Sequence, residues 1–311
     1  MQRGDRVAVF NRGQTNDDLP HNVERLRGDR TDPGQLKVLG GKDFDLIIDT
    51  TLYTGAEAEA VVELFSGHVG RYVVLSTGQV YLVRIGLARP YKEEDYPGPV
   101  MPAPARDDPQ YESWLYGVDK RAAEDRFARA WQEQRFPFTS LRLPMVNSER
   151  DHYDRIYGYF LRLKDGGPLL APEGEGLPLR HVYGDDVVQA IMRASAGDHS
   201  QGRSYNISQE ETLTLQAFLE LLAELIGSRL RIVRVPREKL EREGLLPDCS
   251  PFSGSWMSSL TNRRSKEELG MVYTPLRDYL TKLVNYFQSA PRREIQGYKQ
   301  RARELEFAQM P

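Results

Sequence analysis

The first half of the chain alternates short β-branched runs with helical spacing, and this alternation constrains the fold most. Strand-like runs occur at 6–10, 23–28, 44–51 and 71–77, and residues 56–65 place apolar side chains on one helical face. The last two runs are largely apolar without alternation, which is typical of parallel strands that helices cover on both sides. The pattern predicts an α/β fold with a doubly wound parallel sheet.

Beyond residue 77, a proline-rich stretch at 89–109 predicts a long loop, and such loops in compact domains are often functional lids. A long helix at 113–134 and a strand at 138–143 follow. The remaining chain is less regular. In it we expect helices at 153–164, 185–196, 215–226 and 275–287, strands at 179–183, 204–207 and 231–235, and a solvated charged tail after residue 290.

Two of these helices carry residues typical of helix ends. Thr214 and Gly227 are expected to cap the helix at 215–226. Asp185 or Asp186 is expected to be the N-cap of the helix at 185–196, a structural role that is commoner than catalysis.

The composition excludes several classes of protein. The 42 basic and 45 acidic residues give a net charge of −3, so no overall field attracts a nucleic acid or an anionic membrane. Cys249 is the single cysteine, which excludes an intramolecular disulfide, and together with five scattered histidines it does not suggest a metal site. No apolar run approaches the roughly 20 residues that span a bilayer, and the N-terminus is polar. We expect a cytoplasmic protein without a metal ion.

Tyr116 and Lys120 are the first candidates for chemistry. They lie four residues apart on the predicted helix 113–134, which places both side chains on one face. A lysine ammonium beside a phenol lowers the pKa of the tyrosine from about 10 toward neutrality, so that it exchanges a proton with a carbonyl or alcohol oxygen. By spacing alone, a surface pair on an amphipathic helix is the commoner explanation.

Longer motifs favour the chemical interpretation. Residues 116–124, Tyr-Gly-Val-Asp-Lys-Arg-Ala-Ala-Glu, resemble the catalytic helix of the extended short-chain dehydrogenase/reductase family, which includes the NAD(P)-dependent nucleotide-sugar epimerases and dehydratases. Residues 72–81 are similar to that family's strand-end motif, in which a Ser or Thr four residues before a Tyr binds the reacting oxygen; here it is Thr77. Residues 181–187 fall in the family's order, and the resemblance runs from about Val7 to Phe287.

The resemblance implies a domain organisation. Residues 1–147 would form a Rossmann-like nucleotide-binding domain. Residues 148–290 would form a mainly substrate-binding part, smaller and of α+β type, with some segments that return to the Rossmann core. Residues 291–311 would form a charged C-terminal tail.

The resemblance also implies a mechanism carried by Tyr116, Lys120 and Thr77. Tyr116 would exchange a proton with a substrate oxygen to which Thr77 is also hydrogen-bonded, and Lys120 would hold the nicotinamide ribose. A hydride would move between the nicotinamide and a substrate carbon. The substrate would be a sugar-like or small hydroxy or keto compound, and nucleotide sugars belong to this class. A dimer would form through the helices at 113–134 and 56–65.

Further positions are assigned by the same resemblance. Arg12 follows the first strand, where an arginine accepts the 2′-phosphate of NADP and an acidic residue binds NAD, so Arg12 favours NADP; the alternative is a plain polar turn at 11–13. The cofactor-contacting positions are Asn11, Arg12, Asp29, Arg30, Thr50, Thr51, Leu52, Ser76, Lys120, Pro144 and Met145. The substrate-contacting positions are Thr77, Gln79, Asn147, Arg180 and His181.

One expected motif is missing. A glycine-rich turn after the first strand holds the dinucleotide phosphates in this fold, yet neither G-x-G-x-x-G nor G-x-x-G-x-x-G occurs in the chain. Residues 1–7 resemble the end of the family's first helix, so we expect the first strand, the turn and most of that helix to be lacking. Three explanations stay open: a recorded start downstream of the native one, which we favour, a relative that binds no dinucleotide, or a partner chain or rearranged segment in that position.

The sequence therefore supports one leading function and two alternatives. The leading function is an NAD(P)-dependent epimerase, dehydratase or reductase. The first alternative is a cofactor-independent relative that binds a ligand or uses Tyr116 for acid/base chemistry. The second is an RNA-binding relative, against which the net charge argues. Its basic patch would comprise Arg292, Arg293, Lys299, Arg301 and Arg303.

Overall fold

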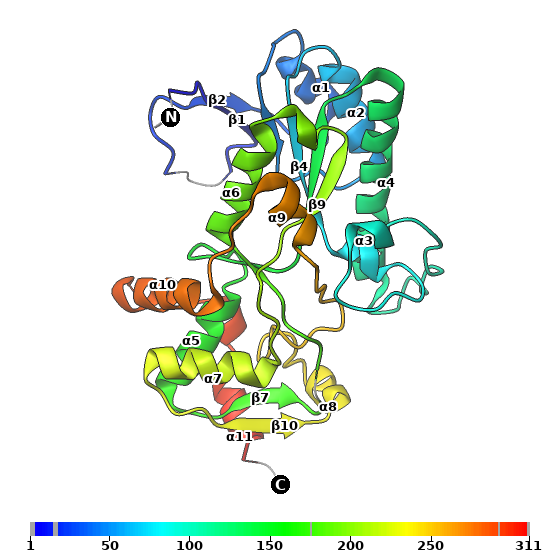
Figure 1. The fold of residues 1–311 in the computed structure, drawn as a ribbon. Coiled ribbons are helices and arrows are strands. Elements are labelled where there is room, and N and C mark those ends of the chain that lie inside the picture. The colour runs from blue at the N-terminus through cyan, green and yellow to red at the C-terminus, as the bar shows by residue number, and fades with distance from the viewer. Residues whose placement is uncertain (1–3, 15–17, 175, 292, 310–311) are drawn as a thin grey trace.

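The protein folds into two lobes, shown by a computed structural model that describes residues 4–14, 18–174, 176–291 and 293–309 (Figure 1). The upper lobe holds the sheet strands β4 and β9 between α4 on one side and α6 on the other. The lower lobe consists of α5, α7, α8, α10 and α11 around a short strand pair. The N-terminus lies at the upper lobe and the C-terminus at the lower one.

The main sheet is parallel and has the strand order β3-β4-β5-β9. Its strands are β3 (Ile47–Asp49), β4 (Tyr72–Thr77), β5 (Phe138–Leu143) and β9 (Arg203–Asn206). A separate parallel pair is formed by β1 (Ala8–Asn11) and β2 (Glu24–Arg27). Among the described residues, no strand pairs with both β1 and β3, so the two sheets remain distinct.

Helices cover both faces of the main sheet because alternate residues of its strands point to opposite sides. Tyr72 packs in a core with α2 (Gly55–Phe65) and α4 (Tyr111–Gln134). Val73, the next residue of β4, packs in a second core with α6 (Gly184–Ser195) and the end of α9 (Arg263–Leu269). The predicted doubly wound α/β fold is confirmed.

The lower lobe is built on three amphipathic helices that share one core. These are α5 (Arg155–Asp165), α7 (Leu215–Ile226) and α10 (Leu276–Ser289). Beside them β7 (Leu169–Pro172) pairs in parallel with β10 (Ile232–Val235), and β6 (Val146–Asn147) pairs with β8 (Val182–Tyr183). The remaining helices are α1 (Pro33–Leu36), α3 (Gln79–Leu82), α8 (Arg237–Arg242) and α11 (Arg301–Phe307). No helix in the described part of the chain has the length and apolar character needed to cross a bilayer.

The helix-end predictions have different outcomes. The Thr214 hydroxyl accepts from the Ala217 N–H at 3.1 Å, and Gly227 ends α7 in the left-handed conformation, as predicted. The prediction for α6 is wrong, because the helix begins one residue before Asp185 and has no side-chain cap. The Asp186 carboxylate instead accepts from the N–H and hydroxyl of Thr274, at 3.0 and 2.8 Å.

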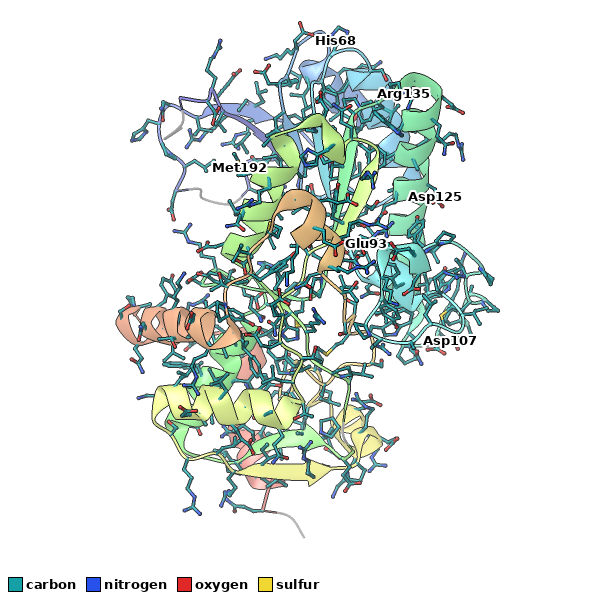
Figure 2. All side chains as sticks on the ribbon, in the orientation of Figure 1. His68, Glu93, Asp107, Asp125, Arg135 and Met192 are labelled. Atoms are coloured by element: carbon teal, nitrogen blue, oxygen red, sulfur yellow. The ribbon has the colours of Figure 1, made fainter. Side chains whose placement is uncertain are left out.

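The proline-rich stretch is not a free lid, because its first residues are fixed to the rest of the protein. The Tyr91 N–H donates to the Ser259 carbonyl, and the Thr261 N–H donates to the Tyr91 carbonyl, both at 2.8 Å. Glu93 lies inside the upper lobe (Figure 2), where its carboxylate accepts from the Asn206 N–H at 2.9 Å.

The charged segment after residue 290 packs against the lower lobe, contrary to the expected solvated tail. Phe307 of α11 is buried, and the Arg301 guanidinium binds Asp165 at 2.7 Å and Glu304 at 3.0 Å. Arg293 and Arg303 also have carboxylate partners, Asp154 and Glu243. Three members of the basic patch proposed for RNA therefore have carboxylate partners, while Arg292 lies outside the described residues.

Candidate functional site

A cleft of about 450 Å³ opens at the carboxyl ends of β4 and β5, the edge at which open parallel sheets bind ligands. Its walls come from both lobes. The lining residues are Thr50, Tyr53, Leu75, Ser76, Thr77, Gln79, Tyr116, Lys120, Leu143, Pro144, Met145, Val146, Ser148, Arg150, Asp151, His152, Tyr153, Arg155, Trp256, Met257 and Ser258. The predicted catalytic set, Tyr116, Lys120 and Thr77, is brought together on these walls.

Close packing of α4 fixes the position of Tyr116. At the next residue, Gly117, a Cβ would lie 2.9 Å from the Gln79 carbonyl oxygen and 2.6 Å from a methyl of Val83. Only glycine permits this approach, and Tyr116, the preceding residue, lines the cleft together with Thr77 at the end of β4.

The pKa of Tyr116 is raised above its ordinary value. Burial is the main cause, and it outweighs the hydrogen bond from Thr77, which lowers the pKa. This differs from the expected lowering by Lys120, because the lysine ammonium is engaged elsewhere. Tyr116 is therefore a neutral phenol at pH 7, able to donate a proton.

Lys120 is buried with its ammonium held by the backbone. Its Nζ donates to the carbonyl oxygens of Leu52 and Leu75, each at 2.7 Å, which leaves one of its three N–H groups for a ligand. Burial lowers its pKa to about 8, against the opposing effect of nearby carboxylates, of which Glu124 is the strongest.

Two tyrosines that the sequence analysis did not single out flank this group. Tyr53 is 48% exposed, and its ring centre lies 6.0 Å from the Tyr116 ring and 5.6 Å from Lys120 Nζ. Tyr153 is 70% exposed and belongs to the loop before α5. Tyr53 directly follows Leu52, a predicted cofactor-contacting position, and this could have indicated that Tyr53 lies at the cleft. No pattern in the sequence marks Tyr153 or residues 256–258 as part of the cleft lining.

The other residues predicted near the nicotinamide are placed differently. Thr50, Ser76, Pro144 and Met145 line the cleft, as does the predicted substrate residue Gln79. Leu52 is fully buried and reaches the site only through its carbonyl. Thr51 is exposed outside the cleft, where its N–H donates to Asp49 at 3.0 Å.

The residues predicted near the adenosine lie at the ends of β1 and β2, outside the cleft lining. Asn11 accepts from the Gly13 N–H, and Asp29 accepts from Thr31, which lowers the pKa of Asp29. The Arg30 guanidinium is occupied by Asp49 at 2.6 Å and by Glu57. The exposed Arg12 has a loose ion pair of 3.9 Å with Asp29.

Three predicted substrate residues do not line the cleft. His181 is buried, with its ring centre 4.5 Å from that of Phe252, and burial lowers its pKa to about 3. The amide of Asn147 binds His181 Nδ1 at 3.1 Å, and Arg180 donates to the Gln209 carbonyl at 2.9 Å. The three side chains are thus engaged within the lower lobe rather than at the cleft wall.

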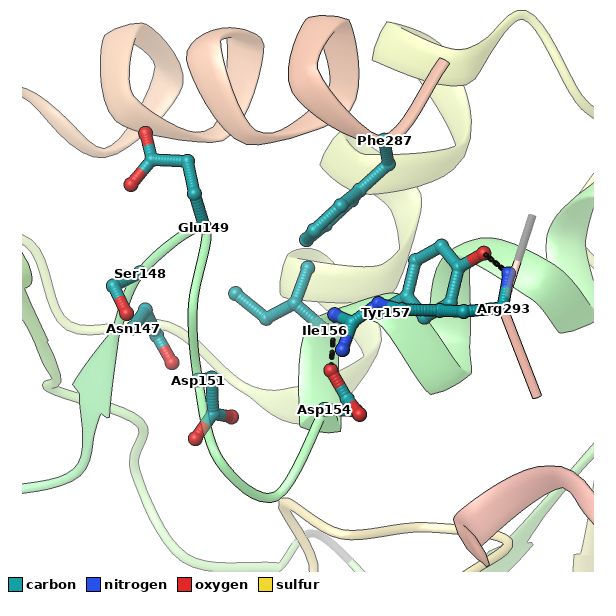
Figure 3. A pocket seen from close by; sticks show the side chains of 9 residues that line it. All are labelled: Asn147, Ser148, Glu149, Asp151, Asp154, Ile156, Tyr157, Phe287 and Arg293. Atoms are coloured by element: carbon teal, nitrogen blue, oxygen red, sulfur yellow. Dashed lines mark hydrogen bonds and ion pairs between the residues drawn. The ribbon is translucent and has the colours of Figure 1, made fainter. Parts of the chain in front are cut away.

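Asn147 instead borders a crevice between the 147–157 segment and α10, which Figure 3 shows from close by. The crevice has no room for a water molecule. Arg293 crosses it to reach Asp154 and lies over the Tyr157 ring, 4.9 Å from its centre. The crevice is therefore a packed contact and not a binding site, and its ion pair holds the loop that carries Tyr153 in place. No cluster of three or more metal-ligating side chains occurs in the described ranges.

A parallel sheet covered on both faces, with a Thr–Tyr–Lys set at its carboxyl edge, defines the architecture of dinucleotide-dependent short-chain dehydrogenases/reductases. The chain belongs to the NAD dependent epimerase/dehydratase family, whose sequence profile matches residues 1–208. No curated protein matches it.

Solved structures share the fold at low sequence identity. UDP-glucose 4-epimerase from Thermotoga maritima, determined with UDP-glucose, has a TM-score of 0.68 and 19% identity, over 92% of each chain. A dTDP-glucose 4,6-dehydratase from Streptomyces venezuelae, determined with NAD, has a TM-score of 0.67 and 19% identity, over 92% of this chain and 88% of its own. UDP-glucose 4-epimerase from Thermus thermophilus, in complex with NAD, has a TM-score of 0.67 and 19% identity, over 93% of each.

Proposed function

We propose that the protein is an NAD(P)-dependent epimerase, dehydratase or reductase acting on a sugar-like substrate, with nucleotide sugars the first class to test. The observation that carries the proposal is that Thr77, Tyr116 and Lys120 together line a cleft of about 450 Å³, where Thr77 lowers the pKa of Tyr116 against the effect of burial. Fold and family supply the context.

In the proposed mechanism Tyr116 donates a proton to the reacting oxygen of the substrate, or takes it back in the reverse direction. Thr77 hydrogen-bonds the same oxygen and orients it. A phenol kept neutral by burial is suited to the donating step.

The residues at the reacting end fit a nicotinamide cofactor. The remaining N–H of Lys120 would hold its ribose, and Pro144 and Met145 would border the ring. When bound, the cofactor supplies the acceptor and donor of hydride. Arg12, exposed and only loosely paired, would bind a 2′-phosphate, which favours NADP over NAD.

The usual binding elements for the cofactor phosphates are not found in the described part of the chain. This supports a second candidate function that needs no cofactor. The chain holds no glycine-rich turn of the usual spacing, and no described strand connects β1 with β3. A cofactor-independent protein that uses the cleft for a ligand would have these features. Titration of the chain with NADPH, followed by nicotinamide fluorescence, separates the two: saturable micromolar binding excludes the cofactor-free function.

The proposed chemistry is tested with UDP-glucose and dTDP-glucose as substrates, by NMR detection of epimerised or dehydrated product. Tyr116→Phe should abolish turnover while it leaves NADPH affinity nearly unchanged, because only the proton-transferring hydroxyl is lost. Tyr111→Phe, at the start of the same helix and outside the cleft lining, is the matched control and should keep full activity. Unchanged turnover in Tyr116→Phe would remove Tyr116 from the mechanism.

We further propose that the active form is a cytoplasmic homodimer built through α2 and α4. Both helices present exposed faces away from the sheet, which is what such an assembly requires.

A further inference from the structure

One face of α4 meets the end of β4 at three successive turns. Tyr116 lines the cleft together with Thr77, and four residues later Lys120 donates to the Leu75 carbonyl at 2.7 Å. Four residues later again, the Glu124 carboxylate accepts from the Ser76 hydroxyl. The i, i+4, i+8 spacing places the three α4 side chains on one stripe. Glu124 is the member of the stripe to which the proposed mechanism gives no role.

Glu124 is held in a buried ion pair with Arg142 of β5. The pair is bidentate: Arg142 Nη2 lies 2.6 Å from Glu124 Oε2 and Nε lies 3.1 Å from Oε1, and both side chains are about 95% buried. The cost of dehydrating two charges commonly cancels the attraction between them, so stability alone does not account for such a pair. What distinguishes this pair is its contact with the strand end that carries Thr77.

Further hydrogen bonds prevent the pair from moving. Arg142 Nη1 donates to the Tyr81 hydroxyl at 2.7 Å, and that hydroxyl donates to Asn206 Oδ1 at 2.8 Å. The Asn206 N–H donates to Glu93 of the proline-rich stretch at 2.9 Å. The Glu124 side chain is therefore held in a single position by a hydrogen-bond network that includes residues of β5, β9 and the 89–109 segment.

We propose that Glu124 is a positioning residue, whose buried carboxylate ties the end of β4 to α4 and so holds Thr77 and Lys120 in register with Tyr116. Successive residues of β4 point to opposite faces, so fixing Ser76 on the α4 side determines how Thr77 is presented to the cleft. The inference rests on the proposed function only for the identity of the reacting groups.

The charge of Glu124 has a second effect, on Lys120. Burial favours the neutral amine, and Glu124 is the strongest of the carboxylates that keep it protonated. Replacing Glu124 by the neutral, nearly isosteric glutamine should therefore lower the pKa of Lys120 by about half a pH unit or more.

This shift can be measured without any substrate. The protein is labelled with 13Cε-lysine, the Lys120 resonance is assigned with Lys120→Arg, and wild type and Glu124→Gln are titrated from pH 6 to 10. Asp186→Asn is the matched control, since Asp186 is a buried carboxylate of α6, which covers the other face of the main sheet, and it accepts from the Thr274 N–H. It should leave the Lys120 titration unchanged. An unaltered titration in folded Glu124→Gln would overturn the electrostatic part of the proposal.

Ser76→Ala tests the register if Glu124→Gln does not fold. It removes only the hydroxyl that Glu124 binds, and the Tyr116 13Cζ resonance at pH 7 should shift as the Thr77 contact loosens. Ser140→Ala is the control, because Ser140 is buried on the adjacent strand β5 and its hydroxyl has no hydrogen-bond partner. Equal spectra for the two variants would overturn the positioning role. Neither readout needs turnover, so failure here is distinguishable from failure of the proposed function.

Discussion

Lys120 is a cation in a place that favours the neutral amine, and this makes the stability of the protein depend on pH in an unusual direction. Its pKa is about 8 in the folded protein, against 10.5 for an ordinary lysine. Between these two values the unfolded chain binds more protons than the folded one. Linkage then requires the free energy of unfolding to rise with pH across this range, and the contribution is lost as pH falls through 8.

We predict that wild type gains stability relative to Lys120→Met as pH increases from 8 to 10. The gain should approach about 1.4 kcal/mol for each pH unit, because one proton is taken up on unfolding of the wild type and none by the variant at this position. Urea denaturation of both proteins at pH 7, 8, 9 and 10 measures the difference. A difference that does not change with pH would show that Lys120 titrates alike in both states.

A second prediction concerns Arg12 and the choice of cofactor. Arg12→Ala should weaken NADPH binding by about tenfold, the loss of one exposed charge contact worth about 1.4 kcal/mol, and leave NADH binding unchanged. Arg27→Ala is the control, since Arg27 hydrogen-bonds Asn11 on the same pair of strands. Fluorescence titration with each nucleotide gives the affinities. Equal losses for NADPH and NADH would mean that Arg12 does not read the 2′-phosphate.

The sequence could predict that Tyr116, Lys120 and Thr77 come together at one cleft because each lies at a fixed spacing within a regular element. Asn147, Arg180 and His181 are different, since their order along the chain does not tell which way the side chains point. His181 follows Arg180 directly, yet it is buried against Phe252, and only the packing of the lower lobe decides this. Tyr153 reaches the cleft from a loop, whose conformation no periodicity encodes.

The segment that ends in α11 shows the same limit for a whole element. Its many charges predicted a solvated tail, but charge density does not reveal whether partners lie elsewhere in the chain. Arg162, on α5, is fully buried, and its Nε donates to Glu304 of α11 at 2.9 Å. The pairing partners are more than a hundred positions apart. By contrast, α4 and α7 could be predicted because the helical periodicity of their side chains is a local feature of the sequence. The capping residues of α7 are local features as well.

From this pair we predict that α11 stabilises the lower lobe. Glu304→Ala should reduce the free energy of unfolding by about 3–5 kcal/mol, because it leaves the Arg162 guanidinium buried without its carboxylate. Glu243→Ala, which removes the partner of Arg303 at an exposed pair, should cost less than about 1 kcal/mol. Thermal and urea unfolding compare the two variants. Similar small losses in both would show that the segment is only loosely attached.

Over the whole molecule, alternation of strands and helices predicts the class of fold but not which strand edges meet. The sequence pattern predicts β1, β2 and β3 as strands. It does not predict that β1 and β2 form a sheet of their own while β3 is an edge strand of the main sheet, because local patterns do not specify strand pairing. Ile48 in β3 remains 44% exposed. Exposed strand edges promote association between chains, so any test of assembly must distinguish the sheet edge from the helical surface.

We predict association through the helical surface formed by α2 and α4. The 24 residues of α4 span about 36 Å, long enough for an interface of about 800 Å² per partner together with α2. Ala56→Arg places a long charged side chain on the exposed side of α2 and should convert a dimer to a monomer at micromolar concentration, because the charge would be buried without a partner. Sedimentation velocity measures the change.

Val188→Arg is the matched control, since Val188 is exposed on α6 at the other face of the sheet. It should sediment as wild type does. Ile48→Lys then separates the two modes of association: it charges the exposed strand β3 and should leave the dimer intact if α2 and α4 form it. A monomer produced by Ile48→Lys but not by Ala56→Arg would place the contact at the sheet edge, and a wild type that sediments as a monomer would exclude both.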